Sequence, residues 1–224
     1  MGKTKVIAIE GIDGSGKSVQ FAMLHDALCA RGLDVATREY PCYESFFGRQ
    51  VGKLLSSADG VSASEVDGKS MALWFALDRF EDFKDYHDGD ADVLIINRFV
   101  LSNAVYQSIR DIDLGKPEIV DWVFELEYGH FGLPRPDAII FYDVDTRQAQ
   151  TNITQKGFRE YVGDRKDVYE ASRGIQQRAR DKYLECAARY REIIVVPCMK
   201  AGAFLAVEAI AAATLDALYA RGII

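Results

Sequence analysis

The residues best suited to chemistry lie in one short segment near the N-terminus, residues 11–18, which read GIDGSGKS. The segment has the spacing G-x-x-x-x-G-K-[ST], completed by Gly16, Lys17 and Ser18. Its glycines allow backbone N–H groups to curl around an anion. The lysine of this pattern reaches terminal phosphates, and the hydroxyl after it ligates Mg²⁺. We therefore expect a nucleoside triphosphate site formed by the whole loop: Gly11, Asp13, Gly14, Ser15, Gly16, Lys17 and Ser18.

The segments on either side of this loop support the interpretation. Residues 5–10, KVIAIE, have the composition of a buried strand, and residues 18–31 carry apolar side chains at helical spacing. A helix that begins at the loop would point the positive end of its dipole at the phosphates. The loop alone does not separate kinases from GTPases or motor ATPases. A GTPase is disfavoured because the sequence contains no N-K-x-D segment for reading guanine.

Elsewhere the chain alternates short apolar runs with helical patterns. The expected strands are residues 5–10, 34–40, 92–99, 137–143 and 192–197, and the expected helices are residues 18–31, 48–55, 69–86, 117–129, 169–191 and 203–220. The strands are solidly apolar, which is typical of a parallel sheet covered on both faces. We predict an α/β protein with a P-loop NTPase-type three-layer fold: a five-stranded parallel sheet, helices on both faces and a small lid segment. Residues 1–224 are expected to form a single domain, with residues 154–167 as the lid insertion.

The overall composition limits the partners of the protein. The formal net charge is −7, so the molecule as a whole is not suited to bind nucleic acid or an anionic membrane. Small nucleotides are the expected partners. No apolar stretch approaches the roughly 18 residues of a membrane span, and no signal-peptide pattern opens the chain. The four cysteines form no CxxC pair, which favours reduced thiols. We expect a cytoplasmic protein.

Five stretches of the sequence read EGIDGSGKS, YPCYESFFGRQVGKLLSS, WFALDRFED, IINRFVLSNAVYQ and FREYVGDRKD. In this order they resemble the motifs of the thymidylate (dTMP) kinases, a family of P-loop nucleoside monophosphate kinases. The resemblance covers nearly the whole chain. It implies transfer of the γ-phosphoryl group of ATP to dTMP, giving dTDP and ADP, with Mg²⁺ bound by Ser18. The family is usually dimeric, so a homodimer is expected, and an apolar face on the helix after Asn97 and Arg98 would permit it.

The resemblance also implies which residues bind the base and sugar of the acceptor. Asp13 would contact the 3′-hydroxyl, Phe75 would stack on the base, and Arg79 would donate a hydrogen bond to a base edge. Stacking together with one donor suits a pyrimidine that carries an O4 atom. From residue type alone, Asp13 is equally a solvated loop acid, and Phe75 is equally a core residue.

The acceptor phosphate is assigned to the end of the third strand. Arg98 would bind it with its forked guanidinium group. The carboxyl ends of parallel strands are where open α/β sheets bind ligands. Ser102, Tyr106 and Gln107 would then line one wall of the site along the next helix. Tyr106 and Gln107 are equally compatible with ordinary helix positions.

The positive charge that stabilises the transferred phosphoryl group would come from the lid. Members of the family carry an arginine either inside the P-loop or in the lid, and here Gly14 and Ser15 occupy that part of the loop. The resemblance therefore assigns this role to Lys156, Arg159 and Arg165, which would close over the γ-phosphate and expel water. A solvated basic loop is the alternative interpretation. The predicted catalytic residues are Lys17, Arg98, Arg159 and Arg165.

The sequence departs from the family pattern at three positions. Asn97 stands where the family has an aspartate, so a negative charge near Mg²⁺ is missing, and Asp143 or Glu10 would have to compensate. The family's arginine just after the proline is also missing, and Arg49 is either its substitute or a surface charge. Lys166 stands where some members have a tyrosine that helps to discriminate 2′-deoxy from 2′-hydroxy sugars.

These departures keep two alternatives open. The first is a kinase of another (deoxy)nucleoside monophosphate or of a deoxynucleoside. A nucleoside acceptor would need a base near its 5′-hydroxyl, and Asn97 is a poor one. The second is a nucleotide-binding protein with a degenerate catalytic site, which would bind ATP tightly without turnover.

Overall fold

A computed structural model of the chain describes residues 3–156 and 174–224. Its centre is a parallel five-stranded sheet in the order β2-β3-β1-β4-β5. The strands are β1 (Lys5–Glu10), β2 (Val35–Glu39), β3 (Val93–Asn97), β4 (Ala138–Asp143) and β5 (Ile193–Pro197). Every residue of β3 is buried, as the solidly apolar sequence of this strand requires when both faces are covered. The predicted α/β class and five-stranded parallel sheet are confirmed.

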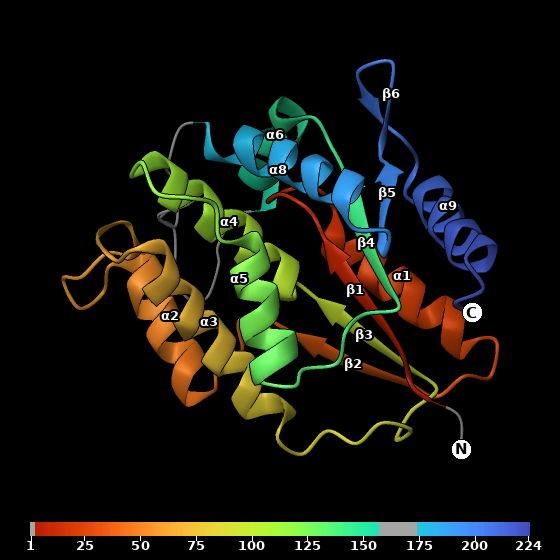
Figure 1. Ribbon diagram of the computed structural model, residues 1–224. Helices are drawn as coiled ribbons and strands as arrows, with labels where there is room; N and C mark the ends of the chain where they lie inside the picture. The colour runs from red at the N-terminus through yellow and green to blue at the C-terminus, as the bar shows by residue number, and fades with distance from the viewer. Residues whose placement is uncertain (1–2, 157–173) are drawn as a thin grey trace.

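Helices cover both faces of this sheet and complete three layers (Figure 1). One face carries α1 (Lys17–Cys29) and α9 (Val207–Ala220), which pack against each other. The other face carries α3 (Gly68–Phe83), α4 (Val100–Asp113), α5 (Val120–Phe124) and α8 (Ile175–Arg189), with α2 (Phe46–Ser56) against α3. Residues 100–109 of α4 are all buried among these helices. The apolar face of α4, which the sequence suggested would permit a dimer, is therefore covered within the chain.

The register of the sheet brings several polar residues to its carboxyl edge. Glu39 pairs with Asn97 across β2 and β3, and Asn97 pairs with Ile9 across β3 and β1. The P-loop begins directly after β1, at Gly11. Since ligands of open α/β sheets bind at this edge, the register places the P-loop, Glu39 and the Asn97–Arg98 pair beside one another.

The last helix begins later than the sequence predicts. The residues before α9 form a short antiparallel hairpin of β6 (Met199–Lys200) and β7 (Ala203–Phe204), and the expected helix 203–220 starts only at Val207. The hairpin turn contains Gly202 with a φ of +82°, a conformation that favours glycine. The alanine-rich sequence has high helix propensity, but the turn overrides it over the first four residues.

One helix, α6 (Thr146–Lys156), has no counterpart in the sequence analysis. Its segment TRQAQTNITQK lacks a continuous apolar stripe, so periodicity does not reveal it. Tertiary contacts support it instead: Ala149 is buried, and Asn152 donates to the carbonyl oxygen of Gly14 in the P-loop (2.9 Å). The lid expected at residues 154–167 starts within α6, and its remainder from residue 157 lies outside the described residues.

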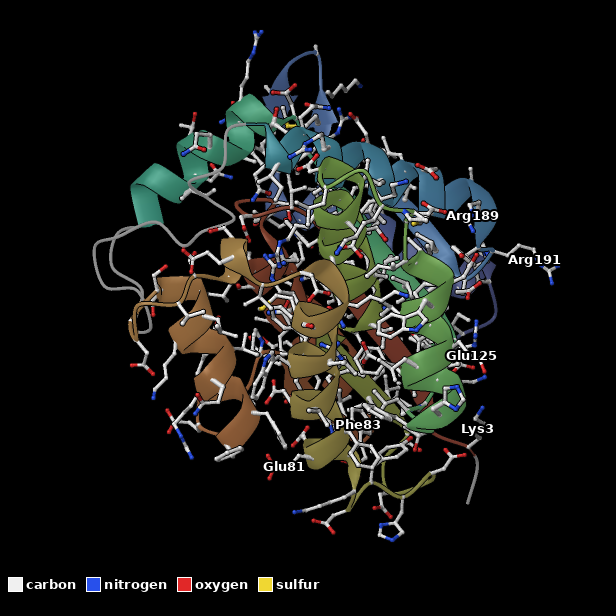
Figure 2. All side chains as sticks on the ribbon, turned by 60° about the vertical axis from the view of Figure 1, so that its left-hand side comes forward. Lys3, Glu81, Phe83, Glu125, Arg189 and Arg191 are labelled. Atoms are coloured by element: carbon white, nitrogen blue, oxygen red, sulfur yellow. The ribbon has the colours of Figure 1, made fainter. Side chains whose placement is uncertain are left out.

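The expected helix 117–129 is divided into two parts. α5 ends at Phe124, and a π-helix, η2 (Glu125–His130), continues the chain. Glu125 lies at the outer side of this turn (Figure 2), whereas Glu127 is fully buried. π-helical turns occur frequently at functional sites, and this one directs a carboxylate into the protein. The expected helix 169–191 corresponds to α8, which is described from residue 174 onwards.

Candidate active site

A cavity of about 520 Å³ opens at the carboxyl edge of the sheet. Its wall comes from the P-loop, the segment after β2, α3, the end of β3 and the first turns of α4. The cavity brings together most of the residues that the sequence analysis assigned to the site: Asp13, Gly14, Ser15, Gly16, Lys17, Ser18, Phe75, Arg79, Arg98, Ser102, Tyr106 and Gln107. Gly11 begins the loop next to this wall. The lid residues Arg159 and Arg165, and the side chain of Lys156, lie outside the part of the chain that the structure describes.

The P-loop is arranged to surround an anion. Gly14 and Gly16 have φ values of +79° and +86°, which glycine adopts without steric cost. Lys17 Nζ donates to the carbonyl oxygens of Gly11 (2.9 Å) and Ile12 (2.8 Å), which holds the ammonium group over the loop. α1 begins at Lys17 without a side-chain cap, so its N-terminus and dipole are directed to the loop. This geometry suits the phosphates of a nucleotide.

Arg98 occupies a special backbone conformation directly after β3. Its φ is +60°, unusual for a residue other than glycine, and its N–H donates to the Ile9 carbonyl oxygen (2.9 Å). Its guanidinium group pairs with Asp13 of the P-loop, which also accepts from Gln176 Nε2 (3.0 Å). Burial works against the charge of Arg98, but the attraction of Asp13 outweighs it and keeps the pKa of Arg98 well above its ordinary value. Arg98 is therefore a fixed cation in the cavity wall.

A buried carboxylate beneath the cavity holds the start of α4. Glu10 accepts hydrogen bonds from the N–H groups of Phe99 (2.8 Å) and Ser102 (3.2 Å). It also accepts from the Tyr183 hydroxyl (3.0 Å) and from the Ser102 hydroxyl. Burial raises the pKa of Glu10 in spite of these bonds. Because its oxygens are occupied, Glu10 does not compensate for Asn97. The Ser102 hydroxyl, predicted beside the base and sugar, is directed to Glu10 instead.

The second acid expected to compensate for Asn97 is engaged elsewhere. Asp143 forms a two-pronged ion pair with Arg180 (2.5 and 3.0 Å) and does not line the cavity. The acid beside Asn97 is Glu39, at the end of the neighbouring strand. Asn97 Nδ2 donates to Glu39 Oε2 at 2.9 Å. Asn97 Oδ1 is buried and has no hydrogen-bond partner among the described residues.

A buried ion pair forms the end of the cavity between α3 and α4. Arg79 Nε and Nη2 donate to the two carboxylate oxygens of Glu127, both at 2.6 Å, and the two side chains are 2% and 0% exposed. Burial opposes the charge of Arg79, but Glu127 outweighs it and raises the pKa of Arg79. Asn103 Nδ2 donates to Glu127 (2.9 Å) and to the Ala72 carbonyl oxygen (3.0 Å). Asn103 Oδ1 is buried without a hydrogen-bond partner in the described part of the chain.

Three residues of this site were not predicted from the sequence: Asn103, Glu127 and Glu39. Asn103 carries a usable signal, because it lies three and four residues before Tyr106 and Gln107 and therefore on the same helix wall. Glu127 carries none, since it is 48 residues from Arg79 and meets it only through the packing of η2 on α3.

The segment after β2 is held in place by α3. Asp78 is fully buried and accepts from the Cys42 N–H (2.8 Å) and the Ser45 hydroxyl (2.6 Å). Burial raises the pKa of Asp78 despite these bonds. The clamp places Tyr43 in the cavity wall. Arg49 is exposed, donates to a backbone carbonyl of its own segment and does not line the cavity, so it acts as a surface charge.

The cavity fits a metal ion that is carried by the nucleotide. The described residues contain no group of three or more His, Cys, Asp or Glu side chains that could hold a metal. Mg²⁺ normally keeps several waters and binds substrate phosphates with one or two protein ligands. Ser18 lines the cavity at the start of α1 and is exposed to it. The buried acceptors Ser15 Oγ and Asn97 Oδ1, which lack partners within the described ranges, also suit a hydrated ion.

Comparisons with known proteins agree with the resemblance found in the sequence. The family model described as thymidylate kinase matches residues 9–201. The thymidylate kinase of Mycobacterium tuberculosis (strain ATCC 25618 / H37Rv) is 34% identical over 187 residues, which cover 82% of this chain and 86% of that protein. The probable thymidylate kinase of Methanocaldococcus jannaschii is 30% identical over 191 residues, which cover 84% of this chain and 85% of that protein.

The fold is similar to a solved structure of thymidylate kinase from Candida albicans. The TM-score is 0.74, and the alignment covers 99% of this chain and 93% of that one at 18% identity. At this identity the likeness establishes the fold alone. The family match, by contrast, runs from β1 to β6 and includes the P-loop, α3 and α4. The resemblance noted in the sequence is thus confirmed: the chain belongs to the thymidylate kinase family and is an enzyme of phosphoryl transfer.

Proposed function

We propose that this protein transfers the γ-phosphoryl group of ATP to dTMP, giving dTDP and ADP. The observation that carries the proposal is a single cavity that joins a P-loop to a buried arginine–asparagine pair with the polarity of a thymine edge. The family match does not favour the two alternatives, another acceptor nucleotide or a degenerate nucleotide-binding protein.

The base is read by Arg79 and Asn103. The amide orientation of Asn103 follows from its partners: Glu127 and the Ala72 carbonyl oxygen only accept, so Nδ2 must face them. The unpartnered Oδ1 is then free to accept from N3–H of thymine, and Arg79 donates to O4. Cytosine presents an acceptor at N3 and a donor at N4, so both contacts would be mismatched. Phe75 lies one helical turn before Arg79 and stacks on the ring.

The phosphoryl transfer itself requires little covalent help from the protein. The acceptor is a phosphate dianion, so no strong general base is needed, and catalysis depends on positioning and electrostatic stabilisation. Lys17 and the loop amides hold the donor phosphates. Ser18 would hold Mg²⁺ together with the nucleotide phosphates, and the ion when bound would neutralise developing negative charge. Arg98 holds the acceptor phosphate opposite the P-loop.

The Arg98–Asp13 pair couples the two substrates. Asp13 belongs to the donor loop and Arg98 to the acceptor side, and their ion pair bridges the cavity wall. Arg98 has five N–H donors, so it can bind a phosphate while it remains paired with Asp13. Asp13 can accept in addition from the 3′-hydroxyl of the acceptor. The lid arginines Arg159 and Arg165 are proposed to complete the positive charge around the γ-phosphate.

We also propose a homodimer, formed by the outer face of α3. Leu73 (39% exposed) and Phe80 (45% exposed) lie seven residues apart, on the same side of this helix. Phe80 also contacts Phe131, with ring centroids 4.7 Å apart. An apolar surface of this kind on a helix that also carries Phe75 and Arg79 would link dimer formation to the site. Analytical ultracentrifugation measures the oligomeric state directly. A monomer at micromolar concentration would contradict the proposed homodimer.

A reducing compartment, the cytoplasm, is the proposed location. The four cysteines are free thiols: Cys29, Cys42, Cys186 and Cys198. Secreted domains usually pair such residues. Over the described ranges, no helix combines the length and apolar character needed to span a bilayer.

The decisive experiment is a coupled ADP-release assay with ATP and Mg²⁺ against a panel of acceptors. The panel contains dTMP, dUMP, UMP, dCMP, dGMP, AMP and thymidine. A strong preference for dTMP is the expected result. Preference for dCMP or AMP would contradict the base reading by Arg79 and Asn103. ATP binding without turnover of any acceptor would contradict the kinase activity.

A further inference from the structure

The Asn97 side chain is oriented by Glu39. A carboxylate only accepts hydrogen bonds, so the group of Asn97 that faces Glu39 must be the NH₂ group, at 2.9 Å. The carbonyl oxygen Oδ1 then points away from Glu39. This oxygen is buried and has no hydrogen-bond partner among the described residues. A buried acceptor without a donor is unfavourable, so the filled site is expected to bring one to it.

The nucleotide complex brings only a few kinds of donor into this cavity. N3–H of the base is assigned to Asn103, between α3 and α4, and the 3′-hydroxyl to Asp13. The phosphates themselves carry acceptors. Asn97 lies level with Ile9 at the edge of the sheet, two residues before the P-loop begins, so its surroundings belong to the phosphates. The remaining donors there are water molecules on Mg²⁺, which retains several of them.

Glu39 supplies a charge that no other acid in the cavity wall offers. Among the described residues that line the cavity, the acids are Asp13 and Glu39. Asp13 is neutralised by its ion pair with Arg98. Glu39 forms no ion pair with any residue in the described ranges, and it is exposed at the end of β2. Its negative charge is therefore available to the cavity, both directly and through the polarised amide of Asn97.

We propose that Glu39 and Asn97 form one outer-shell acceptor pair for water bound to Mg²⁺. The carboxylate on β2 supplies the charge, and the amide on β3 supplies the buried oxygen. The inference rests on the proposed function and names residues that position its metal. It also accounts for the neutral residue at position 97, because the acid stands on the neighbouring strand instead.

A charge-swap cycle tests the pair with four proteins: wild type, Glu39→Gln, Asn97→Asp and the double variant. Glu39→Gln is expected to raise the Mg²⁺ concentration for half-maximal activity about tenfold, as removal of outer-shell partners typically does. In the double variant, the amide at position 39 would donate to the carboxylate at position 97. The hydrogen bond and the net charge are then kept, so the Mg²⁺ requirement should return to within about threefold of wild type. Asn97→Asp alone puts two carboxylates in contact and should be more impaired than the double variant.

Calorimetry provides a readout that does not depend on turnover. The affinity of a non-hydrolysable ATP analogue is measured with and without Mg²⁺. Glu39→Gln should reduce the gain in affinity that Mg²⁺ provides by about tenfold and leave the affinity without Mg²⁺ unchanged. Glu44→Gln is the matched control, because Glu44 is an exposed acid nearby that does not line the cavity.

Two results would overturn the inference. One is a Glu39→Gln protein whose activity and analogue binding depend on Mg²⁺ as in wild type. The other is a double variant no better than Glu39→Gln. If the wild type fails to phosphorylate dTMP, the proposed function fails, but calorimetry with the ATP analogue still decides whether Glu39 and Asn97 position the metal.

Discussion

The two ends of the cavity are built in different ways. In the P-loop at the phosphate end, the contacts of the lysine are local: Lys17 bonds to the carbonyl oxygens of Gly11 and Ile12, six and five residues away. At the base end, Arg79, Asn103 and Glu127 come from three helices, and the pairs are 24 and 48 residues apart. The P-loop can therefore lose the Lys17 side chain without losing the fold. The base end combines recognition with the packing of the core, so damage there affects both.

The largest effect is expected at the phosphate end. Lys17→Ala removes the ammonium group that neutralises the donor phosphates, and turnover should fall by about 10³-fold or more. The free energy of unfolding should change little, because the contacts of Lys17 are local. Steady-state kinetics and urea unfolding measure the two quantities. Lys53→Ala, an exposed lysine on α2, is the control. Retained activity in the Lys17 variant would contradict the P-loop assignment.

At the base end, Glu127→Gln should destabilise the protein itself. It leaves the Arg79 guanidinium buried without its counter-charge, and breaking such a pair typically costs about 3–5 kcal/mol of unfolding free energy. The affinity for dTMP should fall as well, because Arg79 and Asn103 lose their common anchor. Urea unfolding measures the loss of stability, and calorimetry measures the affinity for dTMP.

The matched control for this change is Glu125→Gln, on the same π-helix but 72% exposed. It should shift the unfolding free energy by less than about 0.5 kcal/mol. Equal stability of the Glu125 and Glu127 variants would show that the base end is not coupled to the core.

A smaller effect separates recognition from packing. Asn103→Ala removes the acceptor for N3–H, so the preference for dTMP over dCMP in kcat/KM should fall about 10- to 100-fold. The KM for ATP should stay the same, because the substitution does not touch the P-loop. Ile112→Ala, at an exposed position of the same helix, should leave the preference unchanged. An unaltered preference in the Asn103 variant would remove Asn103 from the base-reading pair.

The smallest effect concerns the clamp between α3 and the segment after β2. Asp78→Asn keeps one acceptor of the two, so the loss at neutral pH should be about 1 kcal/mol of unfolding free energy. Burial raises the pKa of Asp78 above its ordinary value of 3.8, so its contribution to stability is largest below that value and falls as pH rises through the raised pKa. The Asp78→Asn variant has no carboxyl group at this position, so its unfolding free energy lacks this fall.

Unfolding free energies measured from pH 3 to pH 8 would show the difference as a shallower decline in the Asp78→Asn protein. Glu10 has a raised pKa of the same sign, but it is present in both proteins and cancels in the comparison. Asp85→Asn, at an exposed position, should follow the wild-type curve. Parallel curves for the wild type and the Asp78 variant would show that the clamp does not titrate in this range.

Much of the fold was predictable because it depends on short-range patterns. Four of the five strands, β1, β3, β4 and β5, are largely apolar runs, and such runs identify a buried parallel sheet without any knowledge of contacts. α6 and the β6–β7 hairpin were missed for the same reason. The first lacks an apolar stripe and is supported by contacts with the P-loop, and the second is set by a turn at Gly202 within a sequence of high helix propensity.

The phosphate loop, the α/β class and the family could all be predicted from the sequence, because residue spacing, apolar periodicity and the order of the motifs can be read along the chain. The partners that orient the side chains could not be predicted in this way, because they are set by the tertiary packing. It paired Arg79 with Glu127 over 48 residues and Asn97 with Glu39 over 58, and it excluded Glu10 and Asp143 as compensating acids. These choices depend on strand register and helix packing, which bring distant segments within hydrogen-bond reach and leave no trace in local sequence.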